Sequence, residues 1–525
     1  MDTKALRQKI LDLAIRGKLV PQDPNDEPAE VLLERIREQK QQMFKEGKLK
    51  KKDIKNDTII FKGEDNLHYE KFQDGTVKCI EDEIPFEVPE GWAWCKLNDI
   101  YNFIDYRGAT PTKITNGIPL VTAKNVKSGY IDYTIDDYIS EEEFKERQQR
   151  GISKKGDILF TTEAPLGNAA LADMEKFSAG QRLITFQQYG SKDELINYVM
   201  LMFILSDFFQ QQLYVNKTGS TVAGIKAAIL KTLWIPVPPY NEQLRISNTL
   251  KSAINLIDSI SKNKEILSTS ISNTKSKILD LAIRGKIVPQ DPNDEPASVL
   301  LERIRAEKEE LIKQGKIKRD KKESVIFKGD DNSYYLRTGG VEESLEDWRF
   351  DDLPETWKIC CLWELCDYGD CSNVNTEDIA EDAWILDLED IEKDTGTVLK
   401  KVTKAQRNSV STKHKFHSGQ VLYSKLRPYL NKVVLSDADG YCTSEILPLE
   451  FKNCVLPEYA RYYLMSGTFI AYANHCSYGV KMPRLGTTDG KKAIFSLPPL
   501  SEQKRIVETI DFCFMQLNKI SEALA

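Results

Sequence analysis

The chain has 525 residues, of which 41% are hydrophobic and 29% are charged, and its formal net charge is −7. This length exceeds what one core can organise, so we expect several domains, and the composition excludes a disordered or collagen-like chain. The negative charge excludes a protein coated in basic residues, so any face that binds nucleic acid must be local.

The ten cysteines are scattered, and no signal peptide opens the sequence. The longest apolar run, 195–205, is too short to span a bilayer and is interpreted as a buried helix. These features predict a cytoplasmic protein with reduced thiols.

A block of sequence is present twice. Residues 9–37 and 277–305 are nearly identical, and later motifs keep the same order at a spacing of about 260 residues. The chain is therefore a tandem duplication of one large unit. The repeat is faint between about 95 and 230, which indicates a shared scaffold that carries two diverged parts.

The first part of each unit predicts a helix followed by a connector. Residues 1–20 read as a helix, and residues 21–90 read as a connector that contains a second helix over 28–42. The connector is repeated at 286–354.

The diverged parts, 91–240 and 355–500, mix short β-like runs with turns and later become helical, near 193–214 and 457–475. Each part is predicted to be an α/β or α+β domain of about 150 residues. Representative strand-like runs are 118–122, 157–161 and 420–424.

A heptad pattern begins after Pro239 and predicts a scaffold helix over 241–285 that ends at Arg284-Gly285, a basic residue followed by a glycine stop signal. Its apolar positions alternate by four and three, as in a coiled coil, over a rod of roughly 65 Å. The second copy, 501–525, repeats the pattern. The seam positions are Ile246, Leu250, Ile257, Ile260, Leu267, Ile271, Ile278, Ile506, Ile510, Leu517 and Ile520.

The duplicated unit is cut within this helix, so the repeat is circular. The helices over 501–525 and 1–20 are predicted to stack end to end as one rod that runs antiparallel to the 241–285 helix, with a pseudo-two-fold axis. The predicted fold class is α+β, with two α/β domains separated by two long antiparallel coiled-coil helices.

Motifs for common catalytic chemistries are missing from the sequence. We find no G-x-x-x-x-G-K-[ST] loop and no F-x-G-x-G methyl-donor motif. Residues 237–240, Val-Pro-Pro-Tyr, lack the preceding polar residue that would hold a target amine, so they are interpreted as a structural connector. Asp23 with Glu38 imitates a nuclease pair, but Glu38 is replaced by Ala306 in the second copy.

The sequence predicts no metal centre. Cys361, Cys366 and Cys371 are evenly spaced but lack a fourth ligand, so they are interpreted as reduced structural thiols. His414 and His417 lie in a basic stretch and are interpreted as surface histidines.

Both diverged parts carry polar and basic clusters that suit DNA, because Arg and Lys bond guanine edges, Asn and Gln bond adenine, and hydroxyls bond phosphates. Lys425, Arg427 and Tyr429 would share one face if their segment were extended. Ordinary solvated loops are an equal alternative for any single residue. The candidates are Arg107, Thr110, Lys113, Lys124, Asn125, Gln181, Arg182, Lys217, Ser220 and Thr221 in the first part, and Lys425, Arg427, Tyr429, Lys481 and Arg484 in the second.

Over nearly its full length the chain resembles the specificity subunits of type I restriction–modification enzymes. The resemblance rests on the duplicated block, the Pro-Pro-x-x-Glu-Gln entry at 238–243 and 498–503, the strands at 155–160 and 418–423, and the run 422–428. It implies two target recognition domains, each reading one half of a split, asymmetric DNA site. It also implies that the long helices set the spacing and dock two modification (methyltransferase) subunits.

The resemblance further implies a non-catalytic subunit. S-adenosylmethionine, ATP and Mg²⁺ would belong to the modification subunits and to the restriction (motor-nuclease) subunits, and the target adenine would be flipped into a partner's pocket. The basic runs 48–55 and 316–322 are interpreted as paired docking segments or extra DNA backbone contacts, with solvated faces equally open.

Two other hypotheses remain. One is a coiled-coil scaffold that binds only proteins, which a DNA shift assay with the assembled complex would separate from a DNA reader. The other is an enzyme with a degenerate nuclease or methyltransferase site, whose activity would depend on Asp23 and Glu38.

Overall fold

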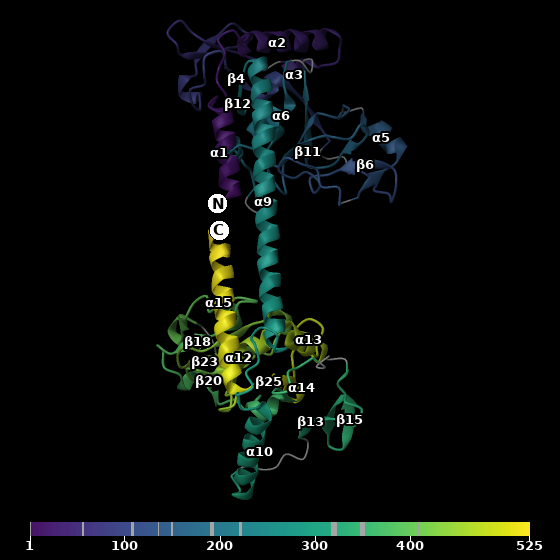
Figure 1. The fold of residues 1–525 in the computed structure, drawn as a ribbon. Coiled ribbons are helices and arrows are strands. Elements are labelled where there is room, and N and C mark those ends of the chain that lie inside the picture. Colours follow the sequence, from purple (N-terminus) through teal and green to yellow (C-terminus); the bar gives the residue numbers. More distant parts are fainter. Residues whose placement is uncertain are drawn as a thin grey trace. The chain divides into compact units, whose positions relative to one another are not determined.

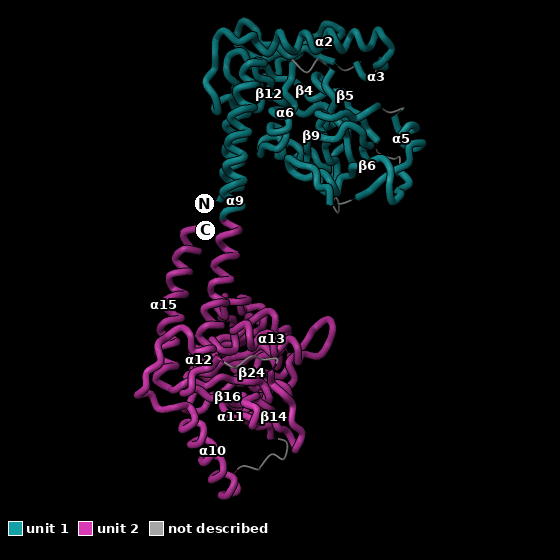
Figure 2. Tube along the Cα trace, turned by 45° about the vertical axis from the view of Figure 1, so that its right-hand side comes forward, with its two compact units in different colours: residues 1–263 teal, residues 264–525 magenta. Residues whose placement is uncertain are grey.

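The computed structural model divides the chain into two compact units, residues 1–263 and 264–525, and each is described by itself (Figure 2). The structure describes residues 2–54, 57–106, 110–134, 136–148, 151–189, 194–219, 223–316, 323–346, 352–407 and 410–524.

Unit 1 begins with three helices and a small sheet (Figure 1). The sheet is an antiparallel meander in the order β1-β2-β3, within the segment that was predicted to be a connector. The first elements are α1 (Thr3–Ile15), α2 (Ala29–Lys45), α3 (Lys51–Ile54), β1 (Ile59–Lys62), β2 (His68–Lys71) and β3 (Val77–Cys79).

The diverged part of unit 1 is built on three sheets, with strand orders β5-β11-β8-β9, β10-β6-β7 and β12-β4. Its strands are β4 (Ala93–Lys96), β5 (Tyr101–Asp105), β6 (Ile118–Val121), β7 (Tyr138–Ile139), β8 (Ile158–Thr161), β9 (Ala169–Leu171), β10 (Ser178–Ala179), β11 (Leu183–Gln188) and β12 (Trp234–Val237). Its helices are α4 (Leu97–Ile100), α5 (Glu141–Arg147), α6 (Asn197–Ile204), α7 (Asp207–Val215) and α8 (Ala227–Leu230).

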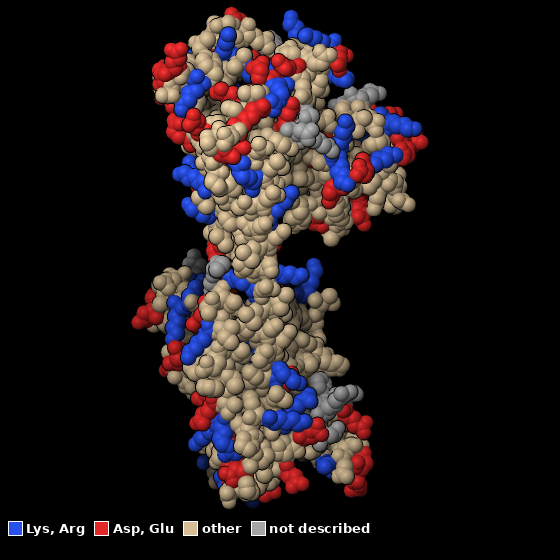
Figure 3. Space-filling view, turned by 45° about the horizontal axis from the view of Figure 1, so that its top comes forward, with Lys and Arg blue, Asp and Glu red and all other residues tan. Residues whose placement is uncertain are grey.

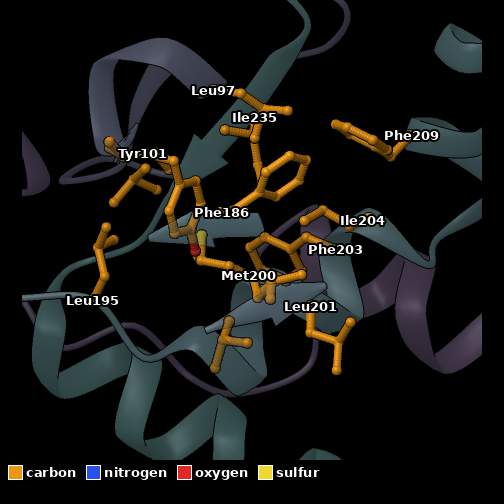
Figure 4. Packing of buried hydrophobic residues seen from close by; sticks show 14 of the residues in the cluster. Leu97, Tyr101, Phe186, Leu195, Met200, Leu201, Phe203, Ile204, Phe209 and Ile235 are labelled. Atoms are coloured by element: carbon orange, nitrogen blue, oxygen red, sulfur yellow. The ribbon is translucent and has the colours of Figure 1, made fainter. Parts of the chain in front are cut away.

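The apolar run near 195–205 forms the buried helix that the sequence predicted. Figure 4 shows Met200, Phe203 and Ile204 of α6 packed with Phe186 of β11, and all four side chains are buried. The predicted helix near 193–214 is two helices, because the Ser206 hydroxyl accepts the backbone N–H of Phe209 and starts α7.

Unit 2 repeats this plan with different sheets, ordered β13-β14-β15, β17-β20-β23-β18-β19, β22-β21-β24 and β16-β25. Its strands are β13 (Ser324–Lys328), β14 (Tyr334–Thr338), β15 (Val341–Ser344), β16 (Lys358–Cys361), β17 (Asn373–Val374), β18 (Trp384–Leu386), β19 (Val402–Thr403), β20 (Lys413–Phe416), β21 (Val421–Ser424), β22 (Val433–Leu435), β23 (Gly440–Thr443), β24 (Ile446–Leu449) and β25 (Ile494–Leu497). Its helices are α10 (Ala297–Lys313), α11 (Leu362–Leu365), α12 (Pro457–Leu464), α13 (Gly467–His475), α14 (Thr487–Lys492) and α15 (Leu500–Leu524).

The predicted long helix is α9 (Tyr240–Ala282), which begins in unit 1 and ends in unit 2. It ends two residues before Arg284, and Gly285 adopts a left-handed φ of 64°, as the glycine signal predicted. Gly17 closes α1 with the same φ.

Two helices run antiparallel within each unit (Figure 1). In unit 1, Arg7 of α1 pairs with Asp258 of α9. In unit 2, Lys275 of α9 donates to Asn518 of α15 at 2.6 Å, and its ammonium lies 5.6 Å from the Phe514 ring centroid. The end-to-end stacking of the terminal helices stays a prediction, and residues 1 and 525 lie outside the described residues.

The predicted apolar seam is buried only in part. Leu267 and Ile520 are exposed, at 40% and 46%, so the prediction of a continuous seam is wrong at these positions. For Leu267, the register set by the Lys275–Asn518 bond places it opposite the end of α15, where few side chains remain to cover it. The buried seam residues are Ile246, Leu250, Ile257, Ile271, Ile506 and Ile510; Ile260, Ile278 and Leu517 are half-buried.

A buried polar joint holds the start of each long helix against its domain. In unit 1, Glu242 accepts the indole N–H of Trp92 at 2.9 Å and the amide N–H of Gln22 at 3.0 Å. Gln243 accepts the backbone N–H of Ile196 at 2.8 Å. The bond from Gln22 joins the repeated block to the Glu-Gln pair at the helix entry, so both motifs belong to the same joint.

Unit 2 makes the same joint with the matching residues. Glu502 accepts from Trp357 at 2.9 Å and from Gln290, and Gln503 accepts the backbone N–H of Leu456 at 2.8 Å. Burial raises the pKa of Glu242 and of Glu502, and the hydrogen bonds from these donors oppose that rise.

Candidate nucleic-acid interface

In unit 1, three loop segments meet beside the end of β8. The Thr162 N–H donates to Arg182 O at 2.9 Å, just before β11. Thr218 and Gly224 are joined by two backbone bonds, at 2.7 and 3.0 Å. Ile225 N–H then donates to Thr162 O at 3.0 Å, so the backbone fixes all three segments to one another.

The same four bonds recur in unit 2. Lys425 N–H donates to Glu445 O at 3.0 Å, Tyr478 and Arg484 exchange two bonds at 3.1 and 3.0 Å, and Leu485 N–H donates to Lys425 O at 3.0 Å. The loop frame is therefore conserved between the units although the residues that form it differ.

Each loop frame contains an ion pair, which we name the clasp. The acidic and the basic residue of the clasp lie on different loops in the two units. In unit 1, Arg182 Nε lies 3.0 Å from Glu163 Oε1. In unit 2, the position of Arg182 is occupied by Glu445, and Arg484 of the hairpin 478–484 pairs with it through Nε–Oε2 at 3.0 Å and Nη2–Oε1 at 2.9 Å. The hydrogen bond to Glu445 raises the pKa of Arg484, which stays charged.

The candidates of unit 1 occupy several different environments. Gln181 donates to the hydroxyl of Thr110, so these two lie together. Lys113 pairs with Asp137 at 2.7 Å, and Lys124 is exposed. Lys217 lies beside Thr218, with its ammonium 3.4 Å from the centroid of the Tyr214 ring.

Asn125 has a structural position. Its side chain is buried, its carbonyl oxygen accepts the N–H and hydroxyl of Thr122, and its amide donates to Asp132 O at 3.0 Å. These bonds close a turn, so the amide is directed to the chain's own backbone and not toward a base. The candidates Arg107, Ser220 and Thr221 lie outside the described residues.

In unit 2 the run 425–429 is not extended, and the prediction of one shared face is wrong. Arg427 adopts a left-handed φ of 51°, and residues 428–430 form a tight 3-10 turn that starts at Pro428. Lys425 is half-buried, and Tyr429 is exposed. The Arg427 N–H donates to Pro483 O at 2.7 Å, which brings this turn against the base of the hairpin.

Arg484 and Lys481, the other two candidates of unit 2, differ in accessibility. The guanidinium of Arg484 is engaged by the Glu445 carboxylate, whereas Lys481 is exposed near the middle of the hairpin. The structure therefore makes Arg484 a clasp residue and leaves Lys481 accessible.

Sequence reasoning missed exposed apolar residues near the bonded loops of both units. In unit 1, Tyr214 and Val215 are exposed where α7 ends. In unit 2, Tyr478, Val480 and Met482 are exposed within the hairpin. The signal in the sequence was a glycine at 479 among alternating apolar residues, which is typical of a short hairpin.

The charged surface and the two histidines of the basic stretch are the remaining features. On the face drawn in Figure 3, Lys and Arg side chains are interspersed with Asp and Glu in each unit. The prediction that His414 is a surface residue is wrong, because its ring is buried against Ile446 O at 2.8 Å, and burial lowers its pKa. His417 is exposed, as predicted, and pairs with Glu450 at 2.9 Å.

Within the described part of the chain, no group of three or more His, Cys, Asp or Glu side chains is arranged to hold a metal ion. Among the described helices, none has both the length and the apolar character that a membrane crossing requires.

The comparisons with known proteins agree with this architecture. The family model described as the type I restriction modification DNA specificity domain matches residues 89–268 and 354–523. The EcoAI specificity subunit of Escherichia coli is 28% identical, with 98% of this chain and 90% of that protein covered. The EcoEI specificity subunit of Escherichia coli is 26% identical, with 99% and 90% covered.

A solved structure from work on complex assembly and conformational transition of the type I restriction–modification system has the same fold. It covers 84% of this chain and 94% of its own, with 16% identity and a TM-score of 0.52. The chain therefore belongs to the specificity subunits of type I restriction–modification enzymes and carries one DNA specificity domain in each half.

Proposed function

We propose that this chain is the DNA-reading, non-catalytic subunit of a type I restriction–modification complex, with each domain recognising one half of a bipartite, asymmetric site. The observation that carries the proposal is the loop frame, which has the same backbone bonds in both units and different side chains around them. A conserved frame with diverged side chains suits two readers of different sequences.

We further propose that modification (methyltransferase) subunits dock on the scaffold helices, and that restriction subunits join that core. Large apolar side chains exposed on these helices support this, because such residues mark protein contacts. They include Leu256 of α9 and Phe512 and Met515 of α15. S-adenosylmethionine, ATP and Mg²⁺ would act in the partner subunits.

The test is an exchange of recognition domains. Residues 92–239 are replaced by the matching segment of another specificity subunit, and the complex with its modification subunits is used to methylate genomic DNA. Methylation mapping should show one half-site changed and the other half-site unchanged. Exchange of residues 357–499 should change the other half-site. A single domain exchange that altered both half-sites would contradict the proposal.

Two controls sharpen this test. The purified chain without partners should transfer no methyl group, and measurable transfer would favour the enzyme hypothesis. Insertion of four residues near Lys264 of α9 should change the tolerated gap between half-sites and leave both half-site sequences intact, if this helix sets the spacing.

A further inference from the structure

The hairpin 478–484 of unit 2 is a short, firmly anchored element. Tyr478 and Arg484 close it, and Gly479 supplies a left-handed φ of 95°. Its base is bonded to the neighbouring turn twice, by Leu485 N–H to Lys425 O and by Arg427 N–H to Pro483 O at 2.7 Å. Both ends of the hairpin are therefore anchored to the domain.

The outer surface of this hairpin is apolar. Val480 is fully exposed, and Tyr478 and Met482 are 62% and 44% exposed. Three large apolar side chains are exposed within one seven-residue hairpin, and exposed apolar side chains close together in the chain are typical of a contact surface.

The polar surroundings favour a nucleic acid as the occupant. Lys481 is exposed among the apolar residues, and Lys425 and Arg427 lie on the turn at the base of the hairpin. Glu445, the acidic residue of the clasp, is neutralised by Arg484.

We infer that this hairpin enters the major groove of DNA and reads thymine, with Val480 and Met482 against the 5-methyl group. The inference rests on the proposed DNA-reading function. The major groove admits a two-stranded ribbon, and the thymine methyl is the apolar group on a base edge that an apolar side chain can recognise. Lysine beside the apolar residues can contact phosphate at the same time.

The clasp is assigned as a positioning pair for this hairpin. Arg484 is bonded to Glu445 and to Met482 O at 3.2 Å, so it holds the hairpin and does not reach a base. In unit 1, Thr218 and Gly224 occupy the positions of Tyr478 and Arg484. The thymine that this hairpin reads is therefore expected in the half-site that unit 2 recognises.

The experiment uses the full chain assembled with its modification subunits and a target motif established by methylation mapping. Each thymine of the unit 2 half-site is replaced singly by uracil, which removes only the methyl group. Equilibrium binding of the wild type should weaken about fourfold at one such position or more, the effect of losing one buried methyl. Val480→Ser should bind the thymine and uracil duplexes equally.

Val410→Ser is the matched control, because Val410 lies in the same unit and is also fully exposed but belongs to another loop. This variant should keep the wild-type preference for thymine at that position. The inference is overturned if the wild type shows no thymine preference in this half-site, or if Val480→Ser retains the preference. Failure of the wild type to bind any target selectively would instead reject the proposed function.

An alternative mode is insertion of Val480 as a wedge between base pairs, which unstacks a step. A 2-aminopurine probe in the half-site would then brighten on binding of the wild type and stay dim with Val480→Ser. That result without a thymine preference also overturns the inference.

The positioning role has its own readout. Arg484→Gln should reduce the thymine preference, and the double exchange Glu445→Arg with Arg484→Glu should restore it by re-forming the pair in the opposite sense. If Arg484 contacted a base directly, the double exchange would fail to restore recognition.

Discussion

The joints and the clasps of the two units evolved differently. At the joints, Trp92–Glu242 and Trp357–Glu502 use the same residues at the same distance, 2.9 Å. At the clasps, the ion pair is retained while its charges have moved to different loops. The comparison shows that the scaffold preserves residues, whereas the recognition loops preserve only a geometry.

The largest expected effect concerns the scaffold glycines. A Cβ atom at Gly17 would lie 2.3 Å from Pro89 Cγ, and one at Gly285 would lie 2.5 Å from Pro354 Cγ, both at left-handed φ. We expect Gly17→Ala and Gly285→Ala each to lower the free energy of unfolding of their own unit by about 3 kcal/mol or more, since a rigid proline ring cannot yield. Hydrogen exchange of peptides from each unit measures this.

Gly47→Ala is the matched control for these variants. Gly47 also has a left-handed φ, but nothing lies within 4 Å of its added Cβ, so its cost should be near the conformational value of about 1 kcal/mol. Equal costs for Gly17→Ala and Gly47→Ala would show that the contact with Pro89 is unimportant.

A second prediction tests whether the two joints are energetically equal. Trp92→Phe and Trp357→Phe each remove one donor from a buried carboxylate, and we expect a loss of about 2 kcal/mol in the corresponding unit. Hydrogen-exchange rates of peptides from unit 1 in Trp92→Phe and from unit 2 in Trp357→Phe should therefore rise by similar factors. Losses that differ several-fold would break the equivalence of the joints.

A third prediction separates the units by pH. Burial raises the pKa of Asp99 to about 6 from 3.8, although the backbone N–H of Lys96 donates to it. Because the folded state holds this proton more tightly, unit 1 loses stability as pH rises from about 4 to about 6. An asparagine at this position carries no titrating proton, so the stability of the Asp99→Asn variant relative to the wild type should rise by about 2 kcal/mol between about pH 4 and about pH 6.

The matching substitution in unit 2 should lower stability instead of raising it. Glu364 of α11 occupies the position that Asp99 has in α4. Glu364 pairs there with Arg305 at 2.7 Å, so Glu364→Gln breaks an ion pair and should destabilise unit 2 at neutral pH. Urea unfolding followed by unit-specific hydrogen exchange at pH 4 and pH 7 measures both variants. A stabilised Glu364→Gln at pH 7 would contradict this contrast.

The smallest expected effect concerns the clasps. Arg484 and Glu445 are 31% and 24% exposed and share two short bonds, whereas Arg182 and Glu163 are 54% and 42% exposed. Double-mutant cycles with alanine should give a coupling of about 1 kcal/mol for the pair in unit 2 and about 0.3 kcal/mol in unit 1. A stronger coupling in unit 1 than in unit 2 would contradict this prediction.

Periodicity explains which parts of the fold the sequence could predict. The long helix α9 and the apolar helix α6 follow patterns that extend over many residues, and strands such as β8 are continuous apolar runs. The meander β1-β2-β3 was missed because its strands have three or four residues and mix polar with apolar side chains.

The candidate interface was less predictable because it depends on contacts between distant segments. Composition identified Arg484 as a possible reader, but its partner Glu445 lies 39 residues away, and only the fold brings them together. Asn125 likewise had the right chemistry for adenine, yet a local turn uses its amide. Residue type indicated the region of the interface, whereas bonding partners decided which side chains remain available.

The exchanged charges of the clasps bear on which segments could be transplanted from one unit into the other. Residues 218–224 of unit 1, transplanted alone into unit 2, would bring Gly224 in place of Arg484 and leave the Glu445 carboxylate without its cation. The smallest segment that could be exchanged with its ion pair intact is therefore the complete set of interlocked loops.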